Sequence, residues 1–213
     1  FVLKPTGDHL KAAQRCTACC LRTATLGLVF NKGTQEPDID CYVDSDFMGA
    51  LNSTGDLRSV GGHTLQHKGR VISWKAATQK TPSLSTTESE LTSGTLGAQE
   101  CMYVSNLIKE IEGTDKAPQY KIRGDNQAML KTCSSERHVG RVKHLDVRYH
   151  FLRFQTTEGK CTLEHVDTKE NAADILTKPL PSETHLRHTA RLVWWTRRMG
   201  CPWSNEDKGC GGM

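Results

Sequence analysis

Four acidic residues, far apart along the chain, have the side-chain type and the positions that a two-metal nuclease needs. They are Asp44 in CYVDSDFMGA, Glu90 in LSTTESELTS, Asp125 in KIRGDNQAML and Asp174 in ENAADILTKP. Carboxylate oxygens are the ligands that a hard cation such as Mg²⁺ prefers. Two such ions side by side can stabilise both the attacking and the leaving oxygen of a phosphodiester. If the fold brings these four side chains together, we expect the chain to cut nucleic acid.

Each of these acids stands where the sequence predicts that a strand or a helix begins or ends. Apolar and polar residues alternate from Ile39 to Asp44, which indicates a strand. Val60–Gln66 and Arg70–Lys75 are predicted as two further strands of an antiparallel meander. Helices are predicted at 8–25, from the Ser85–Thr87 cap to Gly113, and at 126–133, 141–156 and 171–177, with further strands at 120–125 and 161–167.

This element order predicts an α/β fold with a five-stranded mixed sheet flanked by helices on both faces, and it resembles the ribonuclease H fold. Residues 37–181 would form that domain. Residues 1–36 would form a preceding connection. Residues 182–213 would form a basic amphipathic helix to about Met199, followed by a Gly-rich tail.

The bulk composition bounds the class of protein without fixing its function. The chain has 213 residues, 36% of them hydrophobic and 24% charged, with a net charge of +4. This charge is compatible with a nucleic-acid partner and far from diagnostic of one. No run approaches the roughly 18 apolar residues of a membrane span, and no signal peptide is evident. We therefore expect an intracellular protein, cytoplasmic or nuclear and not secreted, and the initial Phe1 suggests a processed product or a fragment.

Nine cysteines raise the alternative of a zinc site or of disulfides. Only Cys16, Cys19 and Cys20 cluster, and a Cys-x-x-Cys pair needs a second pair to complete a tetrahedral site. The nearest candidates, Cys201 and Cys210, are at the other end of the chain and badly spaced. We expect reduced thiols.

Five strings, in order and at matching spacing, resemble one family. They are YVDSDFMG, VISWKAATQKTPSLSTTESEL, GDNQAM, VKHLDVRYHFLR and ADILTKPLP. The chain thus resembles the ribonuclease H domain of copia-type (Pseudoviridae) retrotransposon Pol polyproteins. The stretch from Pro5 to Phe30 resembles the segment that joins reverse transcriptase to ribonuclease H. The resemblance extends to about Leu186, and none is evident beyond Trp194.

The resemblance implies a set of catalytic carboxylates. Asp44 would bridge two Mg²⁺ ions, for which Mn²⁺ can substitute, and Glu90, Asp125 and Asp174 would complete the ligands. Glu88 competes with Glu90, but the two are roughly 200° apart around a helix, so only one can face the site. Glu90 matches the family position, and Glu88 would be an exposed acid in the first helical turn.

Four of the acidic and histidine residues have a second possible role. Asp46 is expected to cap a loop, although it would point the same way as Asp44 along a continuing strand. Asp125 has the alternative of capping the helix that follows, and Asp174 that of a surface acid. His165 matches a mobile histidine of cellular ribonucleases H, which assists proton transfer or product release, but its position within a predicted strand favours a structural role.

The implied substrate is an RNA–DNA hybrid, and the implied partner is the reverse transcriptase portion of the same polyprotein. RNA would be selected through its 2′-hydroxyls, and the phosphate contacts would be salt-dependent and independent of sequence. Candidates for the 2′-hydroxyl contacts are Asn52, Ser53, Thr87, Asn126 and Gln127. Candidates for the phosphate contacts are Arg58, Lys75 and Lys80.

Two other functions compete with catalysis. The loop GALNSTGDLRSVGGHTL departs from the DRKSTSG-like string of the family, and Gly94 and Gly97 weaken the main predicted helix. The tail RLVWWTRRMGCPW offers aromatic and basic groups to a protein or RNA partner. A co-opted ribonuclease H fold, serving as a binding or structural subunit of a larger assembly, is therefore the alternative. A retroviral-type integrase domain fits less well, because its last acid is Glu, whereas the last acid here is Asp174.

Overall fold

The computed structural model describes residues 4–24, 27–28, 30, 39–49, 55–134 and 143–192. The chain divides into two compact units. One contains residues 1–29 and 193–213, and the other contains residues 30–192. Within the described part, no helix is both long enough and apolar enough to cross a membrane.

The first unit contains helix α1, Gly7–Arg22, near the bounds predicted from the sequence. A capping box starts it: the Thr6 side chain accepts a hydrogen bond from the His9 backbone N–H, and the His9 ring accepts one from the Thr6 N–H. Cys16, Cys19 and Cys20 are exposed free thiols on this helix. Among the described residues, no three cysteine or histidine side chains gather closely enough to hold a metal.

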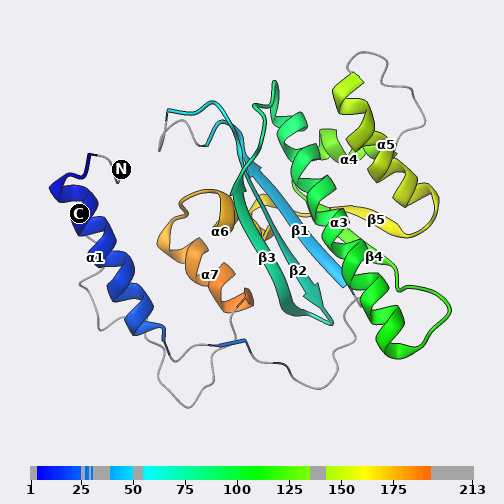
Figure 1. Cartoon of the computed structure of the whole chain (residues 1–213), viewed down its shortest axis with the longest axis horizontal. Coiled ribbons are helices and arrows are strands. Elements are labelled where there is room, and N and C mark those ends of the chain that lie inside the picture. The colour runs from blue at the N-terminus through cyan, green and yellow to red at the C-terminus, as the bar shows by residue number, and fades with distance from the viewer. Residues whose placement is uncertain are drawn as a thin grey trace. The chain divides into compact units, whose positions relative to one another are not determined.

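A five-stranded mixed sheet forms the centre of the second unit, as predicted (Figure 1). Its order is β3-β2-β1-β4-β5. Strand β1 pairs antiparallel with β2, and β2 with β3, whereas β1–β4 and β4–β5 are parallel. The bounds are β1 Ile39–Asp46, β2 Val60–His67, β3 Arg70–Thr78, β4 Tyr120–Gly124 and β5 Cys161–His165.

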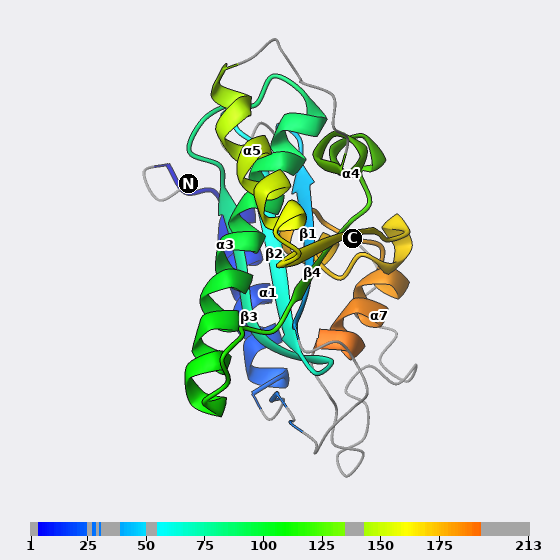
Figure 2. The same cartoon turned by 90° about the vertical axis from the view of Figure 1, so that its right-hand side faces the viewer.

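Helices cover both faces of this sheet (Figures 1 and 2). On one face lie α3, Thr86–Glu112, α4, Gln127–Ser134, and α5, Lys143–Thr157. On the other face α6, Asp174–Thr177, contacts β1, β2 and β3, and α7, Ser182–Leu192, follows it. Because successive side chains of a strand point to opposite faces, β1 contributes to both layers.

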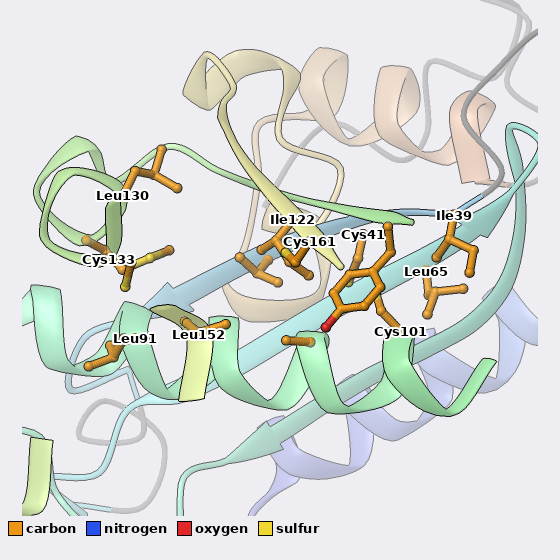
Figure 3. Close-up of a cluster of buried hydrophobic side chains, with 14 of the residues drawn as sticks. Ile39, Cys41, Leu65, Leu91, Cys101, Ile122, Leu130, Cys133, Leu152 and Cys161 are labelled. Carbon is orange, nitrogen blue, oxygen red and sulfur yellow. The ribbon is translucent and has the colours of Figure 1, made fainter. Parts of the chain in front are cut away.

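The main core lies between the sheet and the helices α3, α4 and α5. Its buried side chains include Ile39, Leu65, Ile122 and Leu152, together with the thiols of Cys41, Cys101, Cys133 and Cys161 (Figure 3). Burial raises the pKa of the Cys133 and Cys161 thiols to about 12, so these groups stay protonated and act as small apolar residues. All four are free cysteines in the structure.

Gly97 brings α3 close to β1. A Cβ at this position would lie 2.7 Å from Val43 Cγ1 and 3.1 Å from Cys41 Sγ, which is too close for an unshifted contact. The glycine that weakens α3 as an isolated helix therefore permits the helix–sheet packing that holds it in place.

On the opposite face, charged and aromatic side chains attach α7 to the sheet. The guanidinium groups of Arg123 and Arg191 lie 5.8 and 5.9 Å from the Tyr42 ring centre. Glu170 pairs with Arg187 at 3.0 Å and with Arg191 at 2.8 Å. Residues 182–192 thus pack within the second unit, and the predicted continuation to Met199 lies outside the described residues.

Two predicted bounds before α6 are wrong. The strand predicted to Asp167 ends at His165, because Asp167 caps a 3₁₀ turn, Thr168–Glu170, by accepting a hydrogen bond from the Lys169 N–H. The helix predicted to start at Asn171 starts at Asp174. Asn171 is fully buried and donates its side-chain N–H to the Val43 carbonyl at 2.9 Å, which fixes this loop against β1.

Candidate active site

Three of the four predicted carboxylates meet at one edge of the sheet. Asp44 lies near the end of β1 and Asp125 directly follows β4, and these neighbouring strands run parallel. Asp174 begins α6 beside them. One oxygen from each of Asp44, Asp125 and Asp174 lies within 4.8 Å of the others. Asp44 and Asp174 are buried and Asp125 is half-buried.

Glu90 faces the same group from α3. The Ser45 backbone N–H donates a hydrogen bond to Glu90 Oε1 at 3.3 Å, whereas Oε2 is buried and has no hydrogen-bond partner among the described residues. Burial, followed by the negative charges of Asp44 and Asp125, raises the pKa of Glu90 to about 8. A buried carboxylate oxygen without a hydrogen-bond partner, in a residue near enough to Asp44 and Asp125 for their charges to act on it, is suited to a cation.

Glu88 occupies another position than expected. It is buried rather than exposed, and its Oε2 accepts a hydrogen bond from the Leu84 backbone N–H at 2.7 Å. Ser85 caps the same helix end by accepting from the Glu88 N–H. Glu88 is therefore covered by the loop that its carboxylate binds at the start of α3. The position of Glu88 on the helix face does not by itself predict this contact.

Asp125 does not cap the helix that follows it. Helix α4 starts at Gln127, and the Asn126 side chain accepts the hydrogen bond from the Met129 N–H at 2.9 Å. The Thr168 hydroxyl instead donates to Asp125 Oδ2 at 2.8 Å. The cap and the candidate ligand are thus adjacent residues with separate tasks.

Two residues that the sequence analysis did not single out contact the carboxylates from α6 and its end. The Thr177 hydroxyl donates a hydrogen bond to Asp44 Oδ2. The Lys178 ammonium lies 3.1 Å from Asp174 Oδ1 and 3.6 Å from Asp44 Oδ2. These residues follow Asp174 by three and four positions, so they fall on its side once the chain is helical there. A helix of four residues is too short to be recognised from the sequence alone.

The electrostatics of Asp174 reflect this crowding. Burial, then the charge of Asp44, raises its pKa to about 7, although Lys178 acts in the opposite direction. A divalent cation would relieve both the burial penalty and the repulsion. The donor set consists of carboxylate oxygens, which suits Mg²⁺ or Mn²⁺ better than softer metals. The residues present therefore fit the predicted ion.

Asp46 and His165 lie near this edge. Asp46 is the last residue of β1, so it stands on the same side as Asp44, and its backbone carbonyl accepts a hydrogen bond from the Gly49 N–H. Burial raises the pKa of Asp46. His165 is exposed at the end of β5, where it pairs with Gly124.

Two of the predicted phosphate contacts share a cleft. Lys75 on β3 and Lys80 after it are exposed and, with Arg148 of α5, line a cavity of about 420 Å³ bounded by β2, β3, α3 and α5. Arg58 differs, because its guanidinium Nε donates to Asp56 Oδ2 at 2.6 Å, so part of its charge is already neutralised.

The predicted 2′-hydroxyl contacts are placed only in part. Thr87 is half-buried in the first turn of α3, three residues before Glu90, and Gln127 is exposed at the start of α4, two residues after Asp125. Asn126 uses its side-chain oxygen in the α4 cap. Asn52 and Ser53 lie outside the described residues.

No family model matches this chain. It is 30% identical over 181 residues to the retrovirus-related Pol polyprotein from transposon TNT 1-94 of Nicotiana tabacum, covering 85% of this chain and 13% of that protein. It is also 30% identical over 197 residues to the corresponding polyprotein from transposon RE1 of Arabidopsis thaliana, covering 92% and 13%. The chain is homologous to copia-type retrotransposon Pol polyproteins. It spans about 13% of the length of these relatives.

The homology confirms the resemblance that the five sequence strings indicated. The order and directions of the five strands confirm the predicted ribonuclease H-like fold. Among solved structures, the N-terminal RNase H domain of a Mycobacterium tuberculosis protein gives a TM-score of 0.48 at 11% identity. The match covers 72% of this chain and 97% of that one.

Proposed function

We propose that this chain is a retroelement ribonuclease H that hydrolyses the RNA strand of RNA–DNA hybrids with two Mg²⁺ ions. The observation that carries the proposal is the convergence of Asp44, Asp125 and Asp174 within 4.8 Å of one another, with the buried Glu90 facing them. Burial, followed by the charges of neighbouring carboxylates, raises the pKa of Glu90 and of Asp174, so ionising these two groups is costly to the fold, and a cation that offsets this cost is expected.

Each carboxylate has a distinct place in this mechanism. Asp44 lies on the central strand and is within reach of both Asp125 and Asp174, which suits a ligand shared by two ions. Glu90 would complete the set from the α3 side, where the Ser45 N–H fixes one of its oxygens. The bound ions would supply activation of a water and stabilisation of the leaving 3′-oxygen. The products would carry 3′-hydroxyl and 5′-phosphate ends.

The surroundings of the site support a nucleic-acid substrate. The cleft with Lys75, Lys80 and Arg148 offers three cations to a phosphate backbone. Thr87 and Gln127 flank the carboxylates in sequence and have polar side chains for 2′-hydroxyl groups. We further propose that the chain works with the reverse transcriptase portion of a Pol polyprotein, in the cytoplasm or the nucleus.

Cleavage of a labelled RNA–DNA hybrid by the full chain with Mg²⁺ tests this function. Single-stranded RNA and double-stranded DNA serve as substrates that should remain intact. Asp125→Asn should abolish cutting, because it removes one negative ligand while leaving the Asn126 cap in place. Glu112→Gln, an exposed acid at the far end of α3, is the matched charge control and should cut like the parent.

A folded parent that cuts no hybrid with either Mg²⁺ or Mn²⁺, alone or fused to a reverse transcriptase, would contradict the proposal. That result would favour the alternative of a co-opted binding or structural subunit. Equal cutting by the parent and Asp125→Asn would leave a nuclease whose chemistry does not use this site.

A further inference from the structure

A lysine ammonium lies among the candidate metal ligands. Lys178 Nζ is 3.1 Å from Asp174 Oδ1 and 3.6 Å from Asp44 Oδ2, and its side chain is 31% exposed. It also acts electrostatically on Asp46. The ammonium thus pairs with two carboxylates that a divalent cation would need.

We propose that Lys178 is a positioning residue. Without a metal its ammonium is the counter-ion of the carboxylate cluster, and this ammonium competes with the divalent cation for Asp44 and Asp174. The proposal rests on the proposed function only in taking these carboxylates as the metal ligands. Lys178 would hold the cluster together while the metal is absent and would withdraw when the metal binds.

The backbone around Lys178 is held in place, so only the side chain would have to move when a metal binds. The Thr177 hydroxyl donates to Asp44, and the Lys178 backbone N–H donates to the Asp174 carbonyl at 3.2 Å. Pro179 follows and fixes its own φ. The long lysine stem is the part that can move, and its partial exposure gives the ammonium a path to solvent.

Two measurable consequences have opposite signs. Like charges a few ångströms apart repel, so removing the ammonium should destabilise the metal-free protein. The same removal makes the cluster more negative and frees two ligands, so it should strengthen binding of a divalent cation. A lysine that merely supported the fold would lower stability without tightening metal binding.

Calorimetric titration with Mn²⁺ at fixed pH and low ionic strength tests the proposal on the full chain. Lys178→Met, which keeps the apolar stem, should bind Mn²⁺ about tenfold more tightly or better and should melt at a lower temperature in EDTA. Lys178→Arg keeps the charge and should bind Mn²⁺ no more tightly than the parent. Lys169→Met, an exposed lysine on the nearby 3₁₀ turn, should match the parent in both respects.

Equal or weaker Mn²⁺ binding by Lys178→Met would overturn the proposal. If that variant does not fold without metal, amine labelling of the parent, followed by mass spectrometry, replaces it. Labelling of Lys178 should rise when Mn²⁺ is added, and unchanged labelling at saturating Mn²⁺ would refute displacement. These readouts do not involve cleavage, so a chain that shows displacement but cuts no hybrid would contradict the proposed function alone.

Discussion

The backbone N–H of Ser45 donates a hydrogen bond to Glu90 Oε1 over 3.3 Å, joining the end of β1 to the second turn of α3. The Ser89 hydroxyl adds a second link by donating to the Ser45 hydroxyl at 2.7 Å. These two bonds fix the helix beside the strand that carries Asp44. These bonds consequently hold Glu90 near other carboxylates, although at high pH this lowers the unfolding free energy of the metal-free protein.

We predict that Glu90→Gln stabilises the metal-free protein above neutral pH. The folded-state pKa of Glu90 is about 8 against an ordinary value of 4.5, so the folded state binds the proton more tightly than the unfolded state. The contribution of this proton to the free energy of unfolding is fully present below pH 4.5, and it is lost as the pH rises from 4.5 toward 8. Urea unfolding in EDTA should show a gain of about 1 kcal/mol or more for the variant at pH 8.

The pH series supplies the control for this prediction. At pH 4 the parent Glu90 is already neutral, so parent and Glu90→Gln should differ little in unfolding free energy. Glu112→Gln should leave the pH dependence of the parent unchanged, because this residue is exposed and remote from the cluster. A difference of the same size at pH 4 and pH 8 would indicate a packing effect instead.

We predict that the Thr177 hydroxyl orients Asp44 for metal binding. It donates to Asp44 Oδ2, and partners that orient a metal ligand typically contribute ten- to hundredfold to metal affinity or activity. Thr177→Val preserves the shape of the side chain and should weaken Mn²⁺ binding about tenfold. Thr177→Ser keeps the hydroxyl and should retain most of the affinity. Similar Mn²⁺ affinities for the valine variant and the parent would show that Asp44 needs no such partner.

The positions of the candidate carboxylates could be predicted from the sequence better than their surroundings could. Asp44 and Asp125 could be placed because strand periodicity ends at each of them, and parallel neighbours bring such ends together. Glu90 was preferred to Glu88 by the family position, and the helix geometry agrees. The placement of Asp44 and Asp125 at strand ends needs only local periodicity and element order, whereas the choice of Glu90 rests on the resemblance to the family.

The burial of Glu88 and the position of Lys178 depend on tertiary contacts that no local pattern contains. Glu88 is covered because the loop before α3 folds back and its Leu84 N–H donates to the carboxylate. Lys178 follows an α6 helix of only four residues, too short for a periodic signal. The 3₁₀ turn before that helix arose from the Asp167 cap, which competes with continuation of β5.

We predict opposite effects for alanine at the two glycines of α3. A Cβ at Gly97 would collide with Val43, so Gly97→Ala should destabilise the protein by about 1–3 kcal/mol. A Cβ at Gly94 would meet Met129 Cε at 3.5 Å and Leu152 Cδ1 at 3.6 Å, which are ordinary contacts. Gly94→Ala should therefore stabilise by about 0.5–1 kcal/mol through helix propensity. Chemical denaturation of the two variants would measure both changes, and destabilisation by both would show that α3 tolerates no added bulk on this face.

We predict that Lys75 and Lys80 bind phosphates of the hybrid without reading its sequence. Both are exposed along one cleft with Arg148, whereas Arg58 is already paired with Asp56. Binding of a labelled hybrid in EDTA, measured over a range of salt concentrations, gives a slope that reports the phosphates neutralised. Lys75→Ala with Lys80→Ala should reduce the magnitude of that slope by about 1–2 and weaken binding equally for hybrids of different sequence. Lys116→Ala, an exposed lysine in the loop after α3, is the charge-matched control and should leave the slope unchanged. An unchanged slope in the double variant would indicate that the hybrid binds to another face of the molecule, because the loss of a phosphate contact reduces the number of counterions released on binding.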